Sequence, residues 1–369
     1  MRDSVNRLGR GLAAACLSAA LARGQEDGPD LQGLITALRA PGTTGVAAQA
    51  TTPATPAAAP AATGVPPPAG AASFPGPALR PALRTNAWLQ IALDRHAFGC
   101  GLIDGVPGRK TAQALLDFRY ASAAGSEAET RRRLLQEPVP PFVAYEVTPD
   151  DLAQVGQAPA DWEAAAELPA MACGSLAEVL SEKFHASQAF LQRANPSVAA
   201  WDATLVGRRI WAPNARADTN RPAVAQILLD THALRLRGYD RRGRLTCSFP
   251  CSIARDRAKV PTGELSVANV APHPNYTFDP ANFPESERAQ QIARKLILPP
   301  GPRNPVGVFW ISLSQPGYGV HGTPHPETIG NMESHGCFRL CNWDAATLGR
   351  AIELGVPVRL DSTRIDVAP

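Results

Sequence analysis

A long segment near the N-terminus limits which parts of this 369-residue chain can fold into a domain. Between Pro41 and Pro81 the sequence consists almost entirely of Ala, Pro, Thr and Gly. Because it has few large apolar side chains, such a segment cannot bury a core, and it favours an extended, partly polyproline II conformation. We therefore interpret residues 23–83 as an Ala/Pro-rich linker and expect the folded domains to follow it.

The residues before this linker have the pattern of an export signal. Three arginines precede an apolar stretch over residues 11–22, which ends in the small-residue cleavage site Ala20-Leu21-Ala22. This pattern predicts a signal peptide over residues 1–22 and a protein exported to the periplasm or cell envelope. The sequence leaves lipidation at Cys16 open.

The charge and hydropathy of the chain argue against two classes of partner. The formal net charge is only +3, and the one basic run, Arg131-Arg132-Arg133, is expected on the exposed face of a short helix rather than in a nucleic-acid patch. No apolar run in the sequence is long enough to span a bilayer. We therefore expect no nucleic-acid partner and no transmembrane span.

The first folded region predicted after the linker is a small helical domain over residues 84–124. A tight glycine turn at residues 103–108 separates two segments whose apolar residues have helical spacing. The order and spacing of the turn residues resemble the D-G-x-x-G-x-x-T core of the peptidoglycan-binding type 1 domain, which is matched by Asp104, Gly105, Gly108 and Thr111. The resemblance implies a wall-binding unit.

A second unit is predicted over residues 143–214. A strand near Tyr145 is followed by a helix with Ser175 as N-cap and Glu178 at the capping-box position, then by a second helix and a closing strand. This order resembles a LysM module, which implies an α+β fold and glycan binding. The long insertion over residues 149–172 departs from that family and leaves the binding of glycan open.

The remaining region, residues 223–361, reads mostly as strands. Alternating apolar residues on either side of Asp230 predict a hairpin, and further strands are expected near residues 245–249, 263–270, 308–313 and 356–360. One helix is well marked, with Asn342 as its expected N-cap and Gly355 after its end. We expect a mainly β domain with one helix.

A cysteine beside glycine and histidine in this β-rich region carries the chemistry. Cys337 follows Ser334-His335-Gly336, and His321-Gly322 lies upstream. A thiol is the strongest side-chain nucleophile near neutral pH once an imidazole holds it deprotonated. A base from another strand has more geometric freedom than a neighbour two residues away, so we assign this role to His321 rather than His335. Backbone N–H groups near Gly336 could face an oxyanion.

These segments resemble the active-site signature of the L,D-transpeptidases of the YkuD type, over roughly residues 223–361. Upstream stretches agree, including Pro316-Gly317-Tyr318-Gly319-Val320. The resemblance implies a β-sandwich catalytic domain, so the whole chain would be multidomain. It also implies site roles by position: the nucleophile is Cys337, the base is His321, the carbonyl that orients the imidazole belongs to Gly322, and the substrate groove is lined by Ser334, His335 and Arg339.

The resemblance also implies a reaction without cofactor or metal. The family attacks peptidoglycan stem peptides at the third residue, releases terminal D-Ala and forms an acyl-enzyme. An amine from a second stem or from a lipoprotein lysine then resolves the thioester, whereas water would make the enzyme an L,D-carboxypeptidase. One branch of the family has Asn where this chain has Arg339, so a role assigned to that Asn cannot be transferred.

Cysteine usage leaves the disulfides open. The chain has seven cysteines, namely Cys16, Cys100, Cys173, Cys247, Cys251, Cys337 and Cys341. Cys16 would leave with the signal and a catalytic Cys337 must stay reduced, so at most two disulfides can form. In an extended strand, Cys247 and Cys251 lie too far apart to form a disulfide. One between Cys100 and Cys173 would join two units.

Two other readings compete with a cysteine enzyme. A metal site could draw on His321, His325, His335, Cys337 and Cys341, but no C-x-x-C pair or H-E-x-x-H spacing is present. A binding protein with an inactive catalytic domain would fit the two N-terminal units. The joint presence of His321, His335 and Cys337 argues against that second reading.

Overall fold

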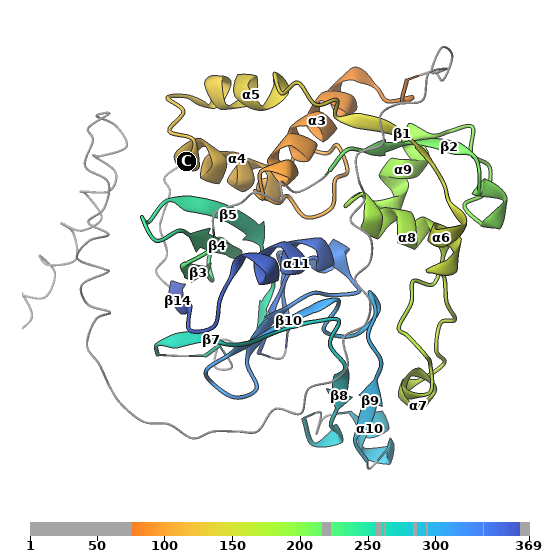
Figure 1. Cartoon of the computed structure of the whole chain (residues 1–369), viewed down its shortest axis with the longest axis vertical. Coiled ribbons are helices and arrows are strands. Elements are labelled where there is room, and N and C mark those ends of the chain that lie inside the picture. Colours follow the sequence, from red (N-terminus) through yellow and green to blue (C-terminus); the bar gives the residue numbers. More distant parts are fainter. Residues whose placement is uncertain are drawn as a thin grey trace, which may run out of the picture. The chain divides into compact units, whose positions relative to one another are not determined.

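The computed structural model describes residues 76–215, 223–254, 260–261, 263–282, 286–292, 294–334 and 336–361 (Figure 1). The predicted signal peptide and most of the predicted linker therefore lie outside the described residues. Among the helices of the described part, none has the length and apolar character needed to cross a membrane.

The first described elements form a helical unit of α3 (Pro81–Arg95), α4 (Arg109–Ala121) and α5 (Glu127–Leu135). The side chain of Gln90 on α3 ties the glycine turn together, because its Nε2 donates to Asp104 Oδ1 at 2.9 Å and to Thr111 Oγ1 at 3.2 Å. Two residues of the peptidoglycan-binding-like signature thus support the turn between the helices. The Arg131–Arg133 triplet lies on α5 and is exposed.

The next unit has a strand–helix–helix–strand order. β1 (Phe142–Glu146) pairs antiparallel with β2 (Arg209–Pro213), and α8 (Leu176–Lys183) and α9 (Gln188–Ala194) lie between them in sequence, followed by η1 (Ala203–Leu205). The predicted N-cap is confirmed, since Ser175 Oγ accepts from Glu178 N at 3.2 Å. The insertion contains the short helices α6 (Pro149–Ala153) and α7 (Trp162–Ala166).

The C-terminal region is built on an eight-stranded sheet in the order β13-β11-β10-β7-β14-β3-β4-β5. Its strands are β3 (Gln226–Asp230), β4 (Arg235–Tyr239), β5 (Leu245–Pro250), β7 (Leu265–Pro272), β10 (Phe309–Leu313), β11 (Gly319–His321), β13 (Phe338–Arg339) and β14 (Pro357–Asp361). Two small sheets accompany it, β6 (Ile253–Ala254) with β12 (Met332–Ser334) and β8 (Tyr276–Phe278) with β9 (Leu296–Leu298). The helical segments are η3 (Pro280–Asn282), α10 (Glu287–Ile292), η4 (Pro326–Thr328) and α11 (Asn342–Ala351).

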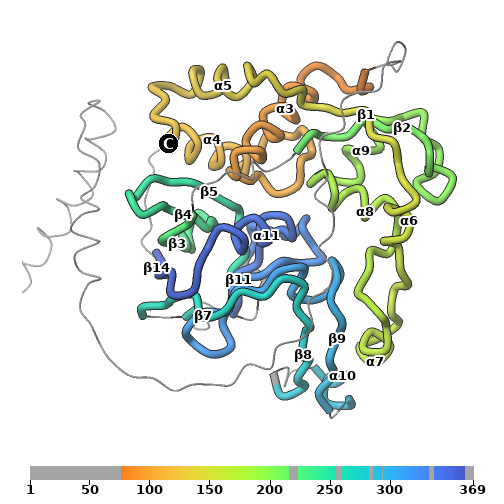
Figure 2. Tube along the Cα trace, in the orientation of Figure 1, coloured from red at the N-terminus to blue at the C-terminus, as the bar shows by residue number. Residues whose placement is uncertain are grey.

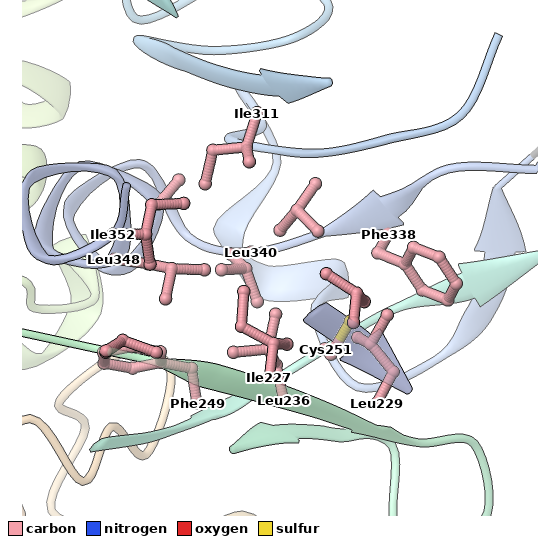
Figure 3. Close-up of a cluster of buried hydrophobic side chains, with 14 of the residues drawn as sticks. Ile227, Leu229, Leu236, Phe249, Cys251, Ile311, Phe338, Leu340, Leu348 and Ile352 are labelled. Atoms are coloured by element: carbon pink, nitrogen blue, oxygen red, sulfur yellow. The ribbon is translucent and has the colours of Figure 1, made fainter. Parts of the chain in front are cut away.

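The core shows that the expected β-sandwich is in fact one curled sheet within the described residues. Leu236 and Phe249 come from one end of the strand order and Ile311 and Phe338 from the other, yet all belong to the same buried cluster, together with Leu348 of α11 (Figure 3). A twisted sheet can bring its ends together when bulges increase the curvature, and the register shifts place an extra residue in β5 against β4 and in β7 against β10.

The helix after the cysteine begins one residue earlier than expected. α11 starts at Asn342, and Cys341 occupies the N-cap position without a side-chain hydrogen bond. The Asn342 side chain is used elsewhere, because its Oδ1 accepts from Val308 N at 3.3 Å and its Nδ2 donates to Pro302 O at 3.2 Å. Asn342 therefore ties the helix to the loop before β10 instead of capping it.

A buried ionic network joins the helical unit to the sheet. Asp117 on α4 accepts from Ser248 Oγ on β5 at 2.6 Å, and its carboxylate lies 3.0 Å from Arg235 Nε and 3.1 Å from Arg237 Nε on β4. The Arg235 side chain is only 1% exposed. Removing one partner of such a pair leaves an uncompensated buried charge.

Replacing Asp117 with Ala should therefore lower the free energy of unfolding by about 3–5 kcal/mol, measured by urea denaturation. The matched control is Glu127→Ala, which removes an exposed ion pair with Arg131 and should cost no more than about 0.5 kcal/mol. A loss below about 1 kcal/mol for Asp117→Ala would contradict a stabilising role for this network.

Candidate active site

The backbone of the candidate site is a parallel strand pair at one edge of the large sheet. β11 and β13 pair with Val320 opposite Phe338 and His321 opposite Arg339. Val320 and Phe338 are buried in the core cluster. Because successive side chains in a strand point to opposite faces, His321 and Arg339 lie together on the face away from that core.

Cys337 directly precedes β13 and lies beside the start of β11. Its Sγ is 3.5 Å from the carbonyl oxygen of Gly317, and the backbone N–H of Gly319 forms a hydrogen bond to it. His321 is two residues further along β11, which corresponds to a rise of roughly 7 Å. The fold thus brings Cys337, His321 and Arg339, which the sequence separates, to the same strand edge.

The imidazole of His321 has a defined tautomer. The carbonyl oxygen of Gly322 lies 2.6 Å from Nδ1 and can only accept, so Nδ1 carries the proton and Nε2 keeps its lone pair. The ring stacks on Trp310 with centroids 5.4 Å apart and planes at 26°. A Cβ on Gly322 would lie 2.3 Å from Asn342 Oδ1, so close packing requires glycine where the chain turns to present this carbonyl.

The electrostatic environment favours the neutral forms of both His321 and Cys337 in the resting site. Burial lowers the pKa of His321 to about 4, with the Gly322 bond opposing this shift and Arg339 adding to it. Burial raises the pKa of the Cys337 thiol, although the Gly319 N–H and Arg339 act in the opposite direction. Near pH 7 both groups are therefore neutral. This differs from the ionised sulfur expected from the sequence, because desolvation outweighs the nearby donors.

Iodoacetamide should consequently alkylate Cys337 more slowly at pH 7 than it alkylates a free cysteine, because a raised thiol pKa lowers the thiolate fraction. The alkylation rate should still be rising above pH 9, whereas reaction with a peptide substrate should decline as acidification protonates His321 through about pH 4. Mass spectrometry across pH, with circular dichroism as the folding control, gives both profiles. Rapid alkylation that is already constant at pH 7 would show a preformed thiolate instead.

Two aromatic residues of this site have no motif that marks them in the sequence. Trp310 supports the His321 ring, as described above. Burial raises the pKa of the Tyr276 phenol, the charge of Cys337 adds to this rise and Arg339 opposes it, so Tyr276 of β8 lies near both residues. Alternation within β10 places Trp310 opposite to the core face, but only the tertiary structure brings Tyr276 here.

The structure describes the other predicted site residues only in part. His335 lies outside the described residues, and for Ser334 the backbone position on β12, paired with Ala254, is described. Gly336 is partly exposed directly before the cysteine. Their predicted roles at the oxyanion and in the groove remain predictions.

Metal ligation and disulfides find no support within the described ranges. No group of three or more His, Cys, Asp or Glu side chains that could hold a metal ion occurs there. His325 is exposed and lies 3.3 Å from Glu327. Cys100 and Cys173 are both free thiols, so the Cys100–Cys173 bridge left open by the sequence is not formed.

A cavity of about 400 Å³ opens beside Arg339. Thr323 and Pro324, which follow the His321-Gly322 turn, line it on one side. The volume lies within the range of sites that bind small molecules or short peptides. The strand edge with Cys337 and His321 therefore has an adjoining space for a substrate.

Comparison with known proteins identifies the class of this site. Residues 225–360 match the family model of the L,D-transpeptidase catalytic domain, YkuD. This region, which contains the curled sheet, Cys337 and His321, is therefore an L,D-transpeptidase catalytic domain. The match does not include the helical unit or the β1–β2 unit.

The chain is also similar to individual proteins. The chain is 26% identical to the Putative L,D-transpeptidase YkuD of Bacillus licheniformis over 53% of this chain and 95% of that protein. It is 29% identical to the Probable L,D-transpeptidase YcfS of Escherichia coli K12 over 53% of this chain and 61% of that protein. A solved L,D-transpeptidase from Mycobacterium smegmatis aligns with 17% identity and a TM-score of 0.30, covering 42% of this chain and 64% of the other.

Proposed function

We propose that this protein is an exported, cysteine-dependent L,D-transpeptidase that acts on peptidoglycan stem peptides. The observation that supports this most directly is the position of Cys337 and His321 on one strand edge of an L,D-transpeptidase catalytic domain. The defined tautomer of His321 adds to it, because Nε2 is available to accept a proton. An inactive wall-binding protein would not need this arrangement.

The neutral pair suggests how acylation proceeds. His321 Nε2 takes the thiol proton as Cys337 Sγ attacks the carbonyl carbon at the third stem residue. The tetrahedral intermediate collapses, the bond to the terminal D-Ala nitrogen breaks, and the imidazolium returns its proton to that leaving amine. Backbone N–H groups near Gly336 would stabilise the oxyanion. Proton transfer during the attack requires no thiolate in the resting enzyme.

The second half-reaction sets the biological outcome. An amine from a neighbouring stem or from a lipoprotein lysine attacks the thioester carbonyl carbon, and His321 accepts a proton from that amine. The C–S bond then breaks, and the imidazolium passes its proton to the sulfur, which restores the free thiol. Water in place of the amine gives a carboxypeptidase. Both outcomes share the same acyl-enzyme.

The accessory units support a location at the cell wall. The strand–helix–helix–strand order of the β1–β2 unit agrees with a LysM-like module, and the glycine turn of the helical unit agrees with a peptidoglycan-binding-like domain. We propose that they keep the enzyme near glycan, with the N-terminal residues serving for export and as a linker.

Incubation of the purified protein with disaccharide-tetrapeptides tests this function. We expect a thioester adduct on Cys337 by mass spectrometry, followed by a product that reveals the acceptor. A cross-linked dimer or an exchanged terminal D-amino acid would indicate transpeptidation, and tripeptide alone would indicate hydrolysis. The absence of any adduct or product would refute the proposed enzyme.

A further inference from the structure

The insertion in the β1–β2 unit packs against the catalytic domain. α7 lies beside β9 (Figure 2), and the ring of Trp162 stacks on Phe278 of β8 with centroids 4.8 Å apart and planes at 18°. Trp162 is also 6.4 Å from the ring of Tyr276, the residue near Cys337. The insertion therefore makes specific aromatic contacts with this hairpin, which an increase in loop length alone would not require.

Buried apolar contacts and backbone bonds hold the insertion in place. Ala165 and Met171 share a hydrophobic cluster with residues of the β8–β9 hairpin and α10. Met171 N donates to Pro300 O at 2.9 Å, and Arg303 N donates to Met171 O at 3.0 Å. The approach is so close that a Cβ on Gly301, whose φ is +148°, would lie 2.2 Å from Met171 O. The insertion is therefore packed closely against the catalytic domain.

The insertion forms one wall of the cavity beside Arg339. Trp162 and Met171 line it from the insertion, and Arg303 and Arg339 line it from the catalytic domain. The one acidic lining residue is Asp161, whose carboxylate is 3.3 Å from Arg288 outside the cavity. The cavity thus combines an apolar wall with two guanidinium groups, which suits a peptide segment that carries a carboxylate.

Arg303 is arranged to bind such a group. Its Nε donates to Glu178 Oε1 at 2.9 Å, which orients the guanidinium, while its side chain is 36% exposed. Its terminal nitrogens pack over Gly174, where a Cβ would lie 2.6 Å from Nη1. An oriented, partly exposed guanidinium in a small cavity is a directional site for a carboxylate.

We propose that this cavity is a subsite for a carboxylate-bearing part of the acyl-donor peptide, with Trp162 as its apolar wall and Arg303 as its carboxylate ligand. The inference rests on the proposed function and deepens it, because it makes the insertion in the N-terminal unit a determinant of substrate selection. The peptide bound there would extend from the carbonyl attacked by Cys337.

Pairing protein variants with modified substrates tests the carboxylate. Arg303→Gln should lower kcat/KM for acylation by a free-carboxylate tetrapeptide at least tenfold, mainly through KM. A series of tetrapeptides, each amidated at a different carboxylate, identifies the group that Arg303 binds. With the peptide that lacks this carboxylate, Arg303→Gln should change kcat/KM less than twofold. The matched control is Arg241→Gln, which removes an exposed guanidinium that does not line the cavity and should leave kcat/KM for all substrates unchanged. Equal losses with every substrate, or no loss at all, would overturn the proposal.

Comparison of the tetrapeptide with the small reagent iodoacetamide separates substrate recognition from folding. Trp162→Ala should reduce acylation by the tetrapeptide at least tenfold but leave the iodoacetamide rate of Cys337 within twofold of the parent, and Trp162→Phe should retain most activity. Equal reductions with both reagents would mean that Trp162 only supports the fold.

Binding separates failure of this inference from failure of the proposed function. If the parent protein is not acylated, the Cys337→Ala variant can be titrated with tetrapeptide by calorimetry. Binding that is lost on adding Arg303→Gln, but not on adding Arg241→Gln, would retain the subsite while refuting the transpeptidase. The absence of binding would overturn the subsite as well.

Discussion

Cys337→Ala is expected to abolish the thioester adduct with tetrapeptide and to reduce turnover on the order of 10⁴-fold or more. The reaction requires a nucleophile at the strand edge, and alanine at this position leaves the oxyanion donors and the cavity in place without one. Intact-protein mass spectrometry measures the adduct, and chromatography of the muropeptides measures turnover.

The control for this experiment is another cysteine of the same chain. Cys173 is 3% exposed, and burial raises the pKa of its thiol to about 12, so it cannot act as a nucleophile near pH 7. Cys173→Ala should form the adduct at close to the parent rate. A thioester mass shift that persists in Cys337→Ala would mean that the nucleophile has been assigned to the wrong residue.

His321→Asn is expected to slow acylation about 10²–10⁴-fold while the protein remains folded. Asparagine can still donate to the carbonyl of Gly322, but it provides no base in place of Nε2. The decline in rate near pH 4, which reports His321 in the parent, should disappear. The variant rate should instead rise with pH as the thiol ionises without assistance.

Two histidines provide comparisons for this prediction. His96, whose side chain is 46% exposed on the helical unit, serves as a surface control, and His96→Asn should leave the rate unchanged. His335→Ala should reduce acylation much less than His321→Asn. If His335→Ala gives the larger loss, the general base is His335.

The course of the C-terminal strands could be predicted from the sequence because alternation is a local property. The apolar residues on either side of Asp230 predicted the hairpin of β3 and β4, and the structure confirms it. Ser175 was likewise predictable as an N-cap, because its contact lies three residues away. The cap at Asn342 was wrong for the opposite reason, since its amide bonds to a loop far away in sequence.

The candidate site likewise contains some residues that the sequence identified and others that only the tertiary structure revealed. The motif around Cys337 and the candidate base His321 were apparent in the sequence because the chemistry restricts the residue types. The contribution of Tyr276 and Trp162 was not apparent in the sequence. Neither residue belongs to a motif, and both reach the site only through packing of β8 and the insertion. The neutral resting state also depends on burial, which no local pattern reports.

The amino-acid sequence by itself determined the mainly β character of the C-terminal region, and it identified Cys337 as a candidate nucleophile with His321 as its candidate base. The tertiary structure decided that the sheet curls on itself, that the thiol and the imidazole are both neutral, and that an insertion from another unit lines the cavity. Periodicity and capping act over a few neighbouring residues, whereas desolvation and the walls of a cavity depend on residues that only folding brings together.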